Sequence, residues 1–310
     1  MTRDFAILTT NLTKRYGNVA AASGLNIAIP RGSICALIGR NGAGKTTLLR
    51  MLFGMVLPTR GTGEVLGLSI VDRRASVEIR RRAAFVDPTA LYPWMSVAEM
   101  LRFARGCYSD WNRAREVAGI FALDLPLDRK IATLSKGMRT TLAVLLALAG
   151  DSEVLFFDEP TDGLDPIVRE QVLRSLVAIN AAHESTLLIS SHQLAELEEI
   201  ANWLCLMDRG RLVLAGDMDE LRASHRRLDV RWASQSGAVA GAIPGVVGMT
   251  RNGEFGTLIV AEDIGDSLRS LGGNIVKEQP ASLKKIVLAY AAPDVGNVSW
   301  VLQGGSNGLA

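Results

Sequence analysis

Short apolar segments alternate with longer amphipathic ones along the first two thirds of the chain. The apolar runs Ser33–Ile38, Val154–Asp158 and Thr186–Ser190 have the length of buried strands. The segments Lys45–Phe53 and Ser135–Ala149 have helical spacing, with Ser135 as a candidate N-cap. Further candidates are a strand at Ala83–Val86 and helices at Ser96–Tyr108, Asn112–Phe121 and Ile167–Ala182. Strands that alternate with helices of this length predict an α/β fold of βαβ units around a mainly parallel sheet.

The pattern changes after about residue 224. Short alternating strands are predicted at Leu228–Trp232, Thr257–Val260 and Asn274–Lys277, together with two short helical patterns. We therefore predict a large domain over residues 1–224, with a helical insertion at about 88–150. A small α+β domain is predicted over 225–290, and the Gly- and Asn-containing residues 291–310 are predicted to form a flexible tail.

From the composition of the chain we expect a globular protein that stays in the cytoplasm. The 310 residues include 34 Lys and Arg against 32 Asp and Glu, and this net charge of +2 argues against a nucleic-acid binder. The most apolar stretch, Leu142–Ala149, is too short to span a bilayer, and no signal peptide is visible. The three cysteines, Cys35, Cys107 and Cys205, are far apart, so we expect neither a disulfide nor a structural metal.

A glycine-rich loop joins the first buried strand to the next helix and fits the pattern G-x-x-x-x-G-K-[ST] without a mismatch. It consists of Gly39, Arg40, Asn41, Gly42, Ala43, Gly44, Lys45 and Thr46, and Thr47 follows it. The glycines let backbone N–H groups turn toward a phosphate at the positive end of the helix. Lys45 would reach the β- and γ-phosphates, and the Thr46 hydroxyl is a hard oxygen ligand for Mg²⁺. A chance glycine-rich turn is the alternative, but the position between strand and helix favours nucleotide binding.

A second apolar strand ends in two carboxylates. Asp158 at this position would hold Mg²⁺ directly or through water, and Glu159 would polarise a water for attack on the γ-phosphate. A strand that ends in solvated acids is the alternative. The intact phosphate loop makes that alternative less favourable.

Five motifs in a fixed order make the chain similar to the ATP-binding-cassette (ABC) ATPases over about residues 7–221. They are Gly39–Thr47, Leu134–Met138, Asp158–Thr161, Gly163–Pro166 and Ser191–His192. The resemblance implies a P-loop NTPase fold whose mainly parallel core carries an antiparallel β part and a helical insertion. It also implies that the protein binds ATP and Mg²⁺ and hydrolyses ATP.

The same resemblance implies that two such subunits pair head to tail, as a homodimer or a heterodimer, and clamp two ATP molecules. Ser135 and Gly137 of the signature motif would then grip the γ-phosphate bound by the partner, although a serine at this position alone is more often just an N-cap. His192 matches the switch histidine, and Asp165 matches the loop that links the two sites. Tyr16 matches the aromatic ring that stacks on adenine, but by itself it is also consistent with a core tyrosine.

Two departures from the family pattern stand out. The signature reads LSKGM rather than LSGGQ, so Lys136 and Met138 replace Gly and Gln. Lys136 would add a positive charge near the nucleotide or face solvent. Asp87 occupies the position of the usual glutamine, where a carboxylate would bind Mg²⁺ more strongly and retune hydrolysis. In the family, acidic residues here with LSKG-type signatures are typical of bacterial subunits that serve exporters.

The leading hypothesis is the ATPase subunit of an ABC exporter, peripheral on the inner face of the cell membrane beside a separate transmembrane permease. A soluble ABC ATPase that remodels a ribosome or a nucleic-acid complex is the first alternative. The segment between Lys45 and Ser135 is too short for the long arm typical of that class. A regulatory ATP switch with slow turnover is the second alternative, which Glu159 and His192 oppose and Asp87 leaves open.

Overall fold

The computed structural model describes residues 4–108, 111–122, 124–233 and 243–291. Contacts within the chain divide it into two units, residues 1–215 and 216–310, so the division falls before the expected boundary at residue 224. The predicted tail lies outside the described residues, apart from Ala291. Every helix in the described ranges is too short or too polar to cross a membrane.

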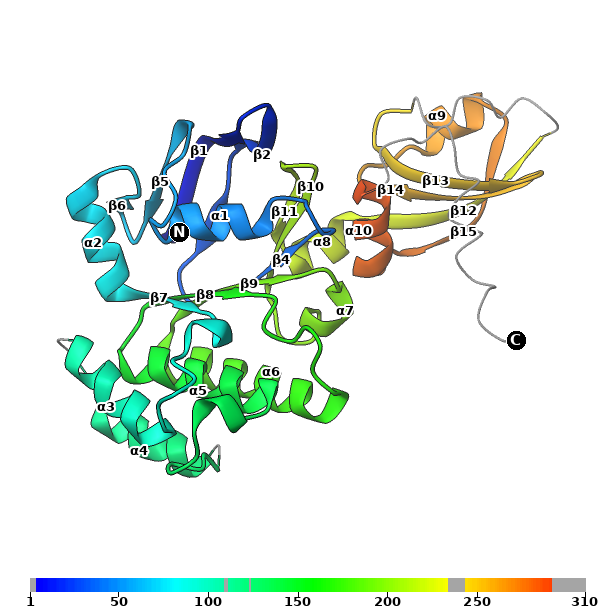
Figure 1. The fold of residues 1–310 in the computed structure, drawn as a ribbon. Helices are drawn as coiled ribbons and strands as arrows, with labels where there is room; N and C mark the ends of the chain where they lie inside the picture. Colours follow the sequence, from blue (N-terminus) through cyan, green and yellow to red (C-terminus); the bar gives the residue numbers. More distant parts are fainter. Residues whose placement is uncertain (1–3, 109–110, 123, 234–242, 292–310) are drawn as a thin grey trace. The chain divides into compact units, whose positions relative to one another are not determined.

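A six-stranded sheet forms the centre of the first unit (Figure 1). Its order is β11 (Arg211–Asp217), β10 (Trp203–Asp208), β4 (Ile34–Ile38), β9 (Thr186–Ser191), β8 (Val154–Asp158) and β7 (Ala83–Val86). The five strands from β10 to β7 pair in parallel. All residues of β4 and β9 are buried, which explains why β4 is a continuous apolar run and why the apolar residues of β9 do not alternate with exposed polar ones.

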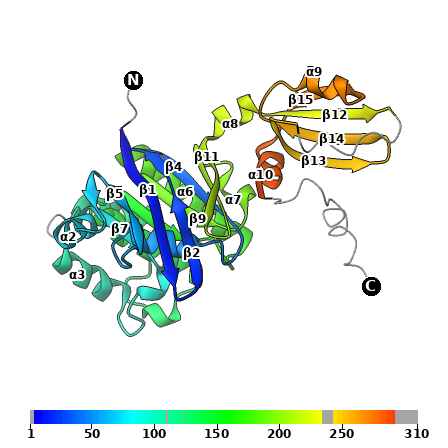
Figure 2. The same cartoon turned by 90° about the horizontal axis from the view of Figure 1, so that it is seen from above.

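A second, antiparallel sheet lies on one side of this core (Figure 2). Its order is β2 (Val19–Leu25), β1 (Phe5–Tyr16), β5 (Arg60–Val65) and β6 (Leu68–Ser69), and β3 (Ala28–Pro30) also pairs with β1. Helix α1 (Lys45–Leu52) lies between the two sheets, and its Leu48, Leu49, Met51 and Leu52 are fully buried in their common core. The implied antiparallel part of the fold is therefore present.

Helices α5 (Lys136–Ala149) and α6 (Pro166–His183) cover the other face of the six-stranded sheet (Figure 1). The remaining helices of this unit are α2 (Arg73–Arg82), α3 (Val97–Cys107), α4 (Arg113–Ala122) and α7 (Leu194–Leu197), with short 3₁₀ turns η1 (Pro88–Ala90) and η2 (Ile131–Thr133). The buried carboxylate of Glu116 on α4 accepts hydrogen bonds from Arg105 on α3 and from Arg113. This shared partner ties the two helices of the predicted insertion together.

The second unit is built on a four-stranded antiparallel sheet. Its order is β13 (Val246–Asn252), β14 (Phe255–Val260), β12 (Arg226–Trp232) and β15 (Gly273–Pro280), and its helices are α8 (Met218–Ser224), α9 (Gly265–Ser270) and α10 (Leu283–Ala291). Trp232, Leu258 and Leu268 form its core. Helix α10 packs along β13 so closely that a Cβ at Gly248 would lie 2.5 Å from Cβ of Ala289. The three predicted strands of this unit are confirmed as parts of β12, β14 and β15.

Cys35 on β4 and Cys205 on β10 are fully buried free thiols with Sγ atoms 3.8 Å apart. Burial raises the pKa of the Cys35 thiol well above its ordinary value, so this thiol stays protonated. Both residues therefore act as small apolar side chains of the core.

Candidate active site

The parallel strands bring the candidate residues to one edge of the six-stranded sheet. Ile38 of β4 is level with Ser191 of β9, and Asp158 of β8 is level with Ser190. The segments that follow Ile38, Asp158 and Ser191 therefore start side by side, as expected for the carboxyl ends of parallel strands. This arrangement joins motifs that lie more than a hundred residues apart in the sequence.

The phosphate loop fits its place only with glycine at two positions. A Cβ at Gly39 would lie 2.6 Å from the Met207 carbonyl oxygen. Gly44 has φ +99°, and a Cβ there would lie 2.1 Å from the Ala21 carbonyl oxygen. A side chain at either position would collide with backbone, so the pattern of glycines has a local steric cause.

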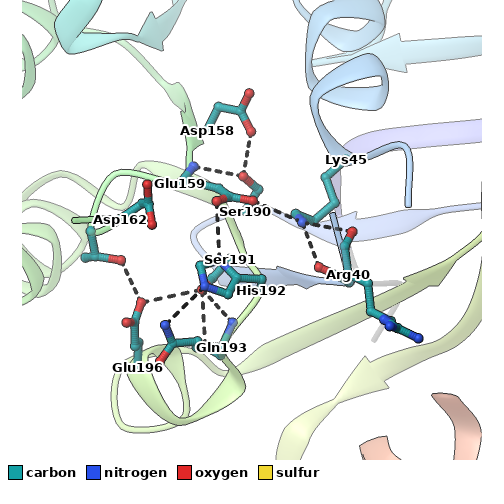
Figure 3. Close-up of polar contacts among 12 residues, drawn as sticks. Arg40, Lys45, Asp158, Glu159, Asp162, Ser190, Ser191, His192, Gln193 and Glu196 are labelled. Atoms are coloured by element: carbon teal, nitrogen blue, oxygen red, sulfur yellow. Dashed lines mark hydrogen bonds and ion pairs between the residues drawn. The ribbon is translucent and has the colours of Figure 1, made fainter. Parts of the chain in front are cut away.

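Lys45 is the buried cation of this loop, with only 5% of its side chain exposed. Its Nζ donates to the Gly39 carbonyl at 2.7 Å and lies 3.1 Å from Oε1 of Glu159 (Figure 3). A buried ammonium needs such partners, because an unpaired charge would be strongly destabilising. The lysine is thus held over the loop, where a phosphate oxygen would offer it another anionic partner.

Ser190 fixes the two carboxylates at the end of β8. Its hydroxyl donates to Oδ1 of Asp158 at 2.7 Å and accepts from the Glu159 backbone N–H at 2.9 Å. Glu159 has φ +49°, a left-handed conformation that costs a non-glycine residue roughly 1–2 kcal/mol. Strain of this kind concentrates at functional sites, and here it turns the Glu159 side chain toward Lys45.

His192 lies on the other side of Glu159. Its Nδ1 is 3.3 Å from Oε2 of Glu159, and its Nε2 is 3.1 Å from Nε2 of Gln193 (Figure 3). Glu159 is therefore flanked by a cation on one oxygen and by an imidazole on the other. A carboxylate in this position has the geometry to orient and polarise a water molecule.

A buried carboxylate on α7 braces the loops behind this site. Glu196, with 6% of its side chain exposed, accepts a hydrogen bond from Thr161 at 2.7 Å and pairs with Arg169 of α6 at 3.1 Å. Ser191 lies 3.5 Å from the same carboxylate. Glu196 thus connects the loop after β8, the end of β9 and α6.

Other residues of the predicted site lie at the same edge without direct contacts to Glu159. Thr46 and Thr47 are half-buried in the first turn of α1, and Arg40 and Asn41 are exposed on the loop. The hydroxyl of Thr46 makes no hydrogen bond with the described residues. Tyr16 is 51% exposed at the end of β1, with the Lys14 ammonium 5.2 Å from its ring centroid, so it is not a core tyrosine.

Asp87 follows β7, and the register of Val86 with Phe157 places it beside the end of β8. Its Oδ1 accepts from the backbone N–H of Thr89 at 2.8 Å and from the Thr89 hydroxyl at 2.6 Å. The carboxylate therefore caps the short turn η1. No contact among the described residues joins it to Asp158 or Thr46.

No contact among the described residues joins the signature residues to the phosphate loop of their own chain. Ser135 caps α5 and accepts from the Met138 N–H at 3.1 Å. Gly137 packs on α6, where a Cβ would lie 2.2 Å from Cγ1 of Val168. Asp165 caps α6, and the Lys136 ammonium contacts Asp162.

Three residues of the site belong to none of the sequence motifs: Ser190, Gln193 and Glu196. Ser190 is the last residue of the predicted strand before His192. Its position at a strand end could have indicated that it lies beside the carboxylates. Glu196 lies four residues after His192 on a short helix, and only its burial shows that it braces the site.

Comparisons with known proteins agree with one another. The family model described as "ABC transporter" matches residues 22–162. The daunorubicin resistance ATP-binding protein DrrA3 of Streptomyces coeruleorubidus is 32% identical over 313 residues, which cover 97% of this chain and 96% of that protein. The bacitracin transport ATP-binding protein BcrA of Bacillus licheniformis is 33% identical, over 75% and 77% of the two chains.

Solved structures show the same fold. The cbiO1 subunit of Clostridium perfringens, described as part of the ABC transporter complex cbiONQ, superposes with a TM-score of 0.63 at 26% identity. That match covers 71% of this chain and 91% of cbiO1. The bacterial ABC transporter cassette MJ0796 superposes with a TM-score of 0.61 at 22% identity, over 68% and 98% of the two chains.

Proposed function

Because the chain belongs to the ABC transporter family, as an ATP-binding subunit that hydrolyses ATP, we propose that it powers export through a separate transmembrane permease. Relatives that it matches over most of its length carry names of bacitracin transport and daunorubicin resistance proteins. A third, from Cupriavidus metallidurans, is a Nod factor export protein, 35% identical over 71% of this chain and 74% of its own. These names support export of a bulky organic compound.

In the proposed reaction, the phosphate loop and Lys45 bind the β- and γ-phosphates of ATP. Tyr16, half-exposed at the end of β1, stacks on the adenine. Thr46 and Asp158 fit a magnesium ion, because both are hard oxygen donors and the Thr46 hydroxyl is uncommitted within the described residues. The ion, when bound, would neutralise phosphate charge.

The position of Glu159 carries the proposal for hydrolysis. Its carboxylate lies 3.1 Å from Lys45 Nζ and 3.3 Å from His192 Nδ1, at the strand end next to the phosphate loop. When phosphate takes over Lys45, the freed carboxylate oxygen accepts a hydrogen bond from the attacking water. His192 then contacts the γ-phosphate and keeps that water in line.

The active unit in this proposal is a head-to-tail dimer. Ser135, Gly137 and the N-terminus of α5 form an anion-binding surface that no described contact joins to Lys45 of the same chain. A second ATPase subunit would bring its own phosphate loop to that surface. Asp165, which caps α6, lies on the loop that would cross this interface.

An exposed aromatic cluster supports docking to the permease. The rings of Trp94 and Phe103 lie 5.1 and 5.4 Å from that of Tyr92, and 65% of Trp94 is exposed. Exposed aromatic clusters are typical of protein interfaces. A cytoplasmic segment of the permease would place the subunit on the inner face of the membrane.

Glu159→Gln tests the whole proposal, because it should trap ATP and hold the dimer closed. The variant is expressed in its native cell and isolated with Mg-ATP, and integral proteins that sediment with it are identified. Co-purification with one multi-span protein is expected. An ATP-closed dimer that travels with ribosomes or DNA instead would contradict transport and favour a remodelling ATPase.

A further inference from the structure

Lys136 makes a contact that the proposed function does not use. Its ammonium donates to the main-chain carbonyl of Asp162 and lies 3.7 Å from Oδ2 of the same residue. Gly163 has φ +64° and turns the loop toward this ammonium, so that a Cβ there would lie 3.3 Å from Nζ. The first turn of α5 thus holds the loop between β8 and α6 through one side chain.

Asp162 faces the catalytic carboxylate as well as Lys136. One ligand-type atom from each of Glu159, Asp162 and His192 lies within 4.8 Å of the other two. The Asp162 backbone N–H also donates to the Glu159 carbonyl at 3.2 Å. A shift of Asp162 therefore changes the charge and the backbone position beside Glu159.

The electrostatics of α5 allow an anionic ligand to replace Asp162 as the partner of Lys136. A cation in the first turn of a helix is unfavourable because it faces the positive end of the helix dipole, and α5 has no acidic residue in its first turn. Asp162 offsets that charge only weakly, since the two side chains are 45% and 56% exposed. A phosphate at the same helix end carries more negative charge and competes with Asp162 for Lys136.

We propose that Lys136 is a positioning residue that exchanges Asp162 for the γ-phosphate bound by the partner subunit, and so couples the two ATP sites. The inference rests on the proposed head-to-tail dimer. With the signature surface empty, Lys136 holds Asp162 and the loop beside Glu159. When nucleotide arrives at that surface, Lys136 moves to the phosphate, and the released loop lets Glu159 and His192 of the opposite site adopt their hydrolytic positions.

The test compares ATP hydrolysis by the full chain with that of Lys136→Met, Asp162→Asn and the double variant. Lys136→Met removes the ligand for phosphate and should raise the KM for ATP about two- to fivefold. Asp162→Asn removes the side-chain charge that attracts Lys136 and leaves only the main-chain carbonyl, so Lys136 should move to the phosphate more easily and the KM should fall by a similar factor. Lys136→Met and Asp162→Asn should each reduce the Hill coefficient for ATP toward one. Lys136→Arg keeps the positive charge and should retain the wild-type Hill coefficient.

Controls separate this coupling from general charge effects. Lys130→Met and Asp128→Asn remove exposed charges from the segment before the signature and should change neither KM nor the Hill coefficient. The double variant should show no greater loss of cooperativity than Lys136→Met alone, because that substitution already removes both contacts between Lys136 and Asp162.

Two outcomes would overturn the inference while the proposed function stands. One is hydrolysis by the wild type with a Hill coefficient of one. The other is a wild-type Hill coefficient in Asp162→Asn. A wild-type chain with neither hydrolysis nor an ATP-dependent dimer would instead contradict the proposed function, and the inference would fall with it.

Discussion

The six-stranded and the four-stranded sheet of this protein differ in how they arrange polar residues. At the six-stranded sheet, Lys45, the pair Asp158 and Glu159, and His192 come from the ends of three different strands, β4, β8 and β9, and converge at one edge. In the four-stranded sheet, Asp229 of β12 accepts hydrogen bonds from Arg227 of the same strand and from Thr257 of the neighbouring strand. The first set converges where a ligand can bind, whereas the polar groups of the second set form hydrogen bonds with one another.

Strand direction explains this difference. Parallel strands all deliver their carboxyl ends to one edge, so residues from distant segments meet there. In an antiparallel sheet, the carboxyl ends of neighbouring strands lie at opposite edges. Polar side chains on such strands pair with one another across the surface of the sheet instead. Chemistry is therefore expected only at the edge of the six-stranded sheet, and four predictions test this contrast.

The largest effect is expected from removal of the catalytic carboxylate. Glu159→Gln should lower the turnover number about 10²- to 10⁴-fold, because an amide cannot accept the proton of the attacking water. Steady-state phosphate release measures this loss. Asp229→Asn is the matched control in the other sheet and should hydrolyse ATP at the wild-type rate. Equal losses of turnover in the two variants would contradict the conclusion that only the edge of the six-stranded sheet carries the chemistry.

The second prediction concerns the core of the four-stranded sheet. Trp232 is only 2% exposed, and Trp232→Ala should destabilise residues 216–310 by about 3–5 kcal/mol. Denaturant unfolding followed by circular dichroism should show one early transition, with ATP hydrolysis retained before it begins. Trp232→Phe should shift that transition less. Loss of hydrolysis in step with the early transition would show that the two units unfold together.

The third prediction concerns Asp87 at the edge of the active site. Asp87→Gln should remain active but change turnover and the Mg²⁺ dependence by a few fold, since the acceptor that caps η1 is displaced by a longer side chain. Asp87→Asn keeps a short acceptor for the cap of η1 but removes the charge, so it distinguishes the effect of the cap from the effect of the charge. Titration of ATP hydrolysis with Mg²⁺ measures the turnover number and the Mg²⁺ dependence of each variant. Unchanged turnover and Mg²⁺ dependence in Asp87→Gln would remove Asp87 from the site.

The smallest effect is expected from Asp229. Burial favours the neutral form, but the Thr257 hydrogen bond and the Arg227 charge outweigh it and lower the pKa of Asp229 below its ordinary value. A lowered folded-state pKa stabilises the fold above the unfolded-state pKa, and that stabilisation is lost as the pH falls below about 4.

The contribution of this partly exposed pair should be about 0.5 kcal/mol. Unfolding of Asp229→Asn should therefore depend less on pH between about 4 and 2 than unfolding of the wild type. Identical acid dependence of the two proteins would show that the pairing adds no stability.

Much of the site could be predicted because its motifs are local. The phosphate loop needs its glycines for steric reasons confined to a few residues, and Lys45 and Thr46 follow directly on the helix. The buried strands β4 and β8 were predictable because parallel strands covered on both faces are apolar throughout. Long mixed strands such as β1, with exposed and buried positions interrupted by register shifts, gave no comparable signal.

By itself, the sequence determined which residues can bind phosphate and where the buried strands lie, because both depend on short-range sterics and periodicity. Only the tertiary structure decided that Lys45 meets Glu159, that Glu196 braces the loops and that Lys136 contacts Asp162. Each of these contacts joins separate elements whose distance is set by the order and direction of strands and by helix packing. No local pattern of residues contains that information.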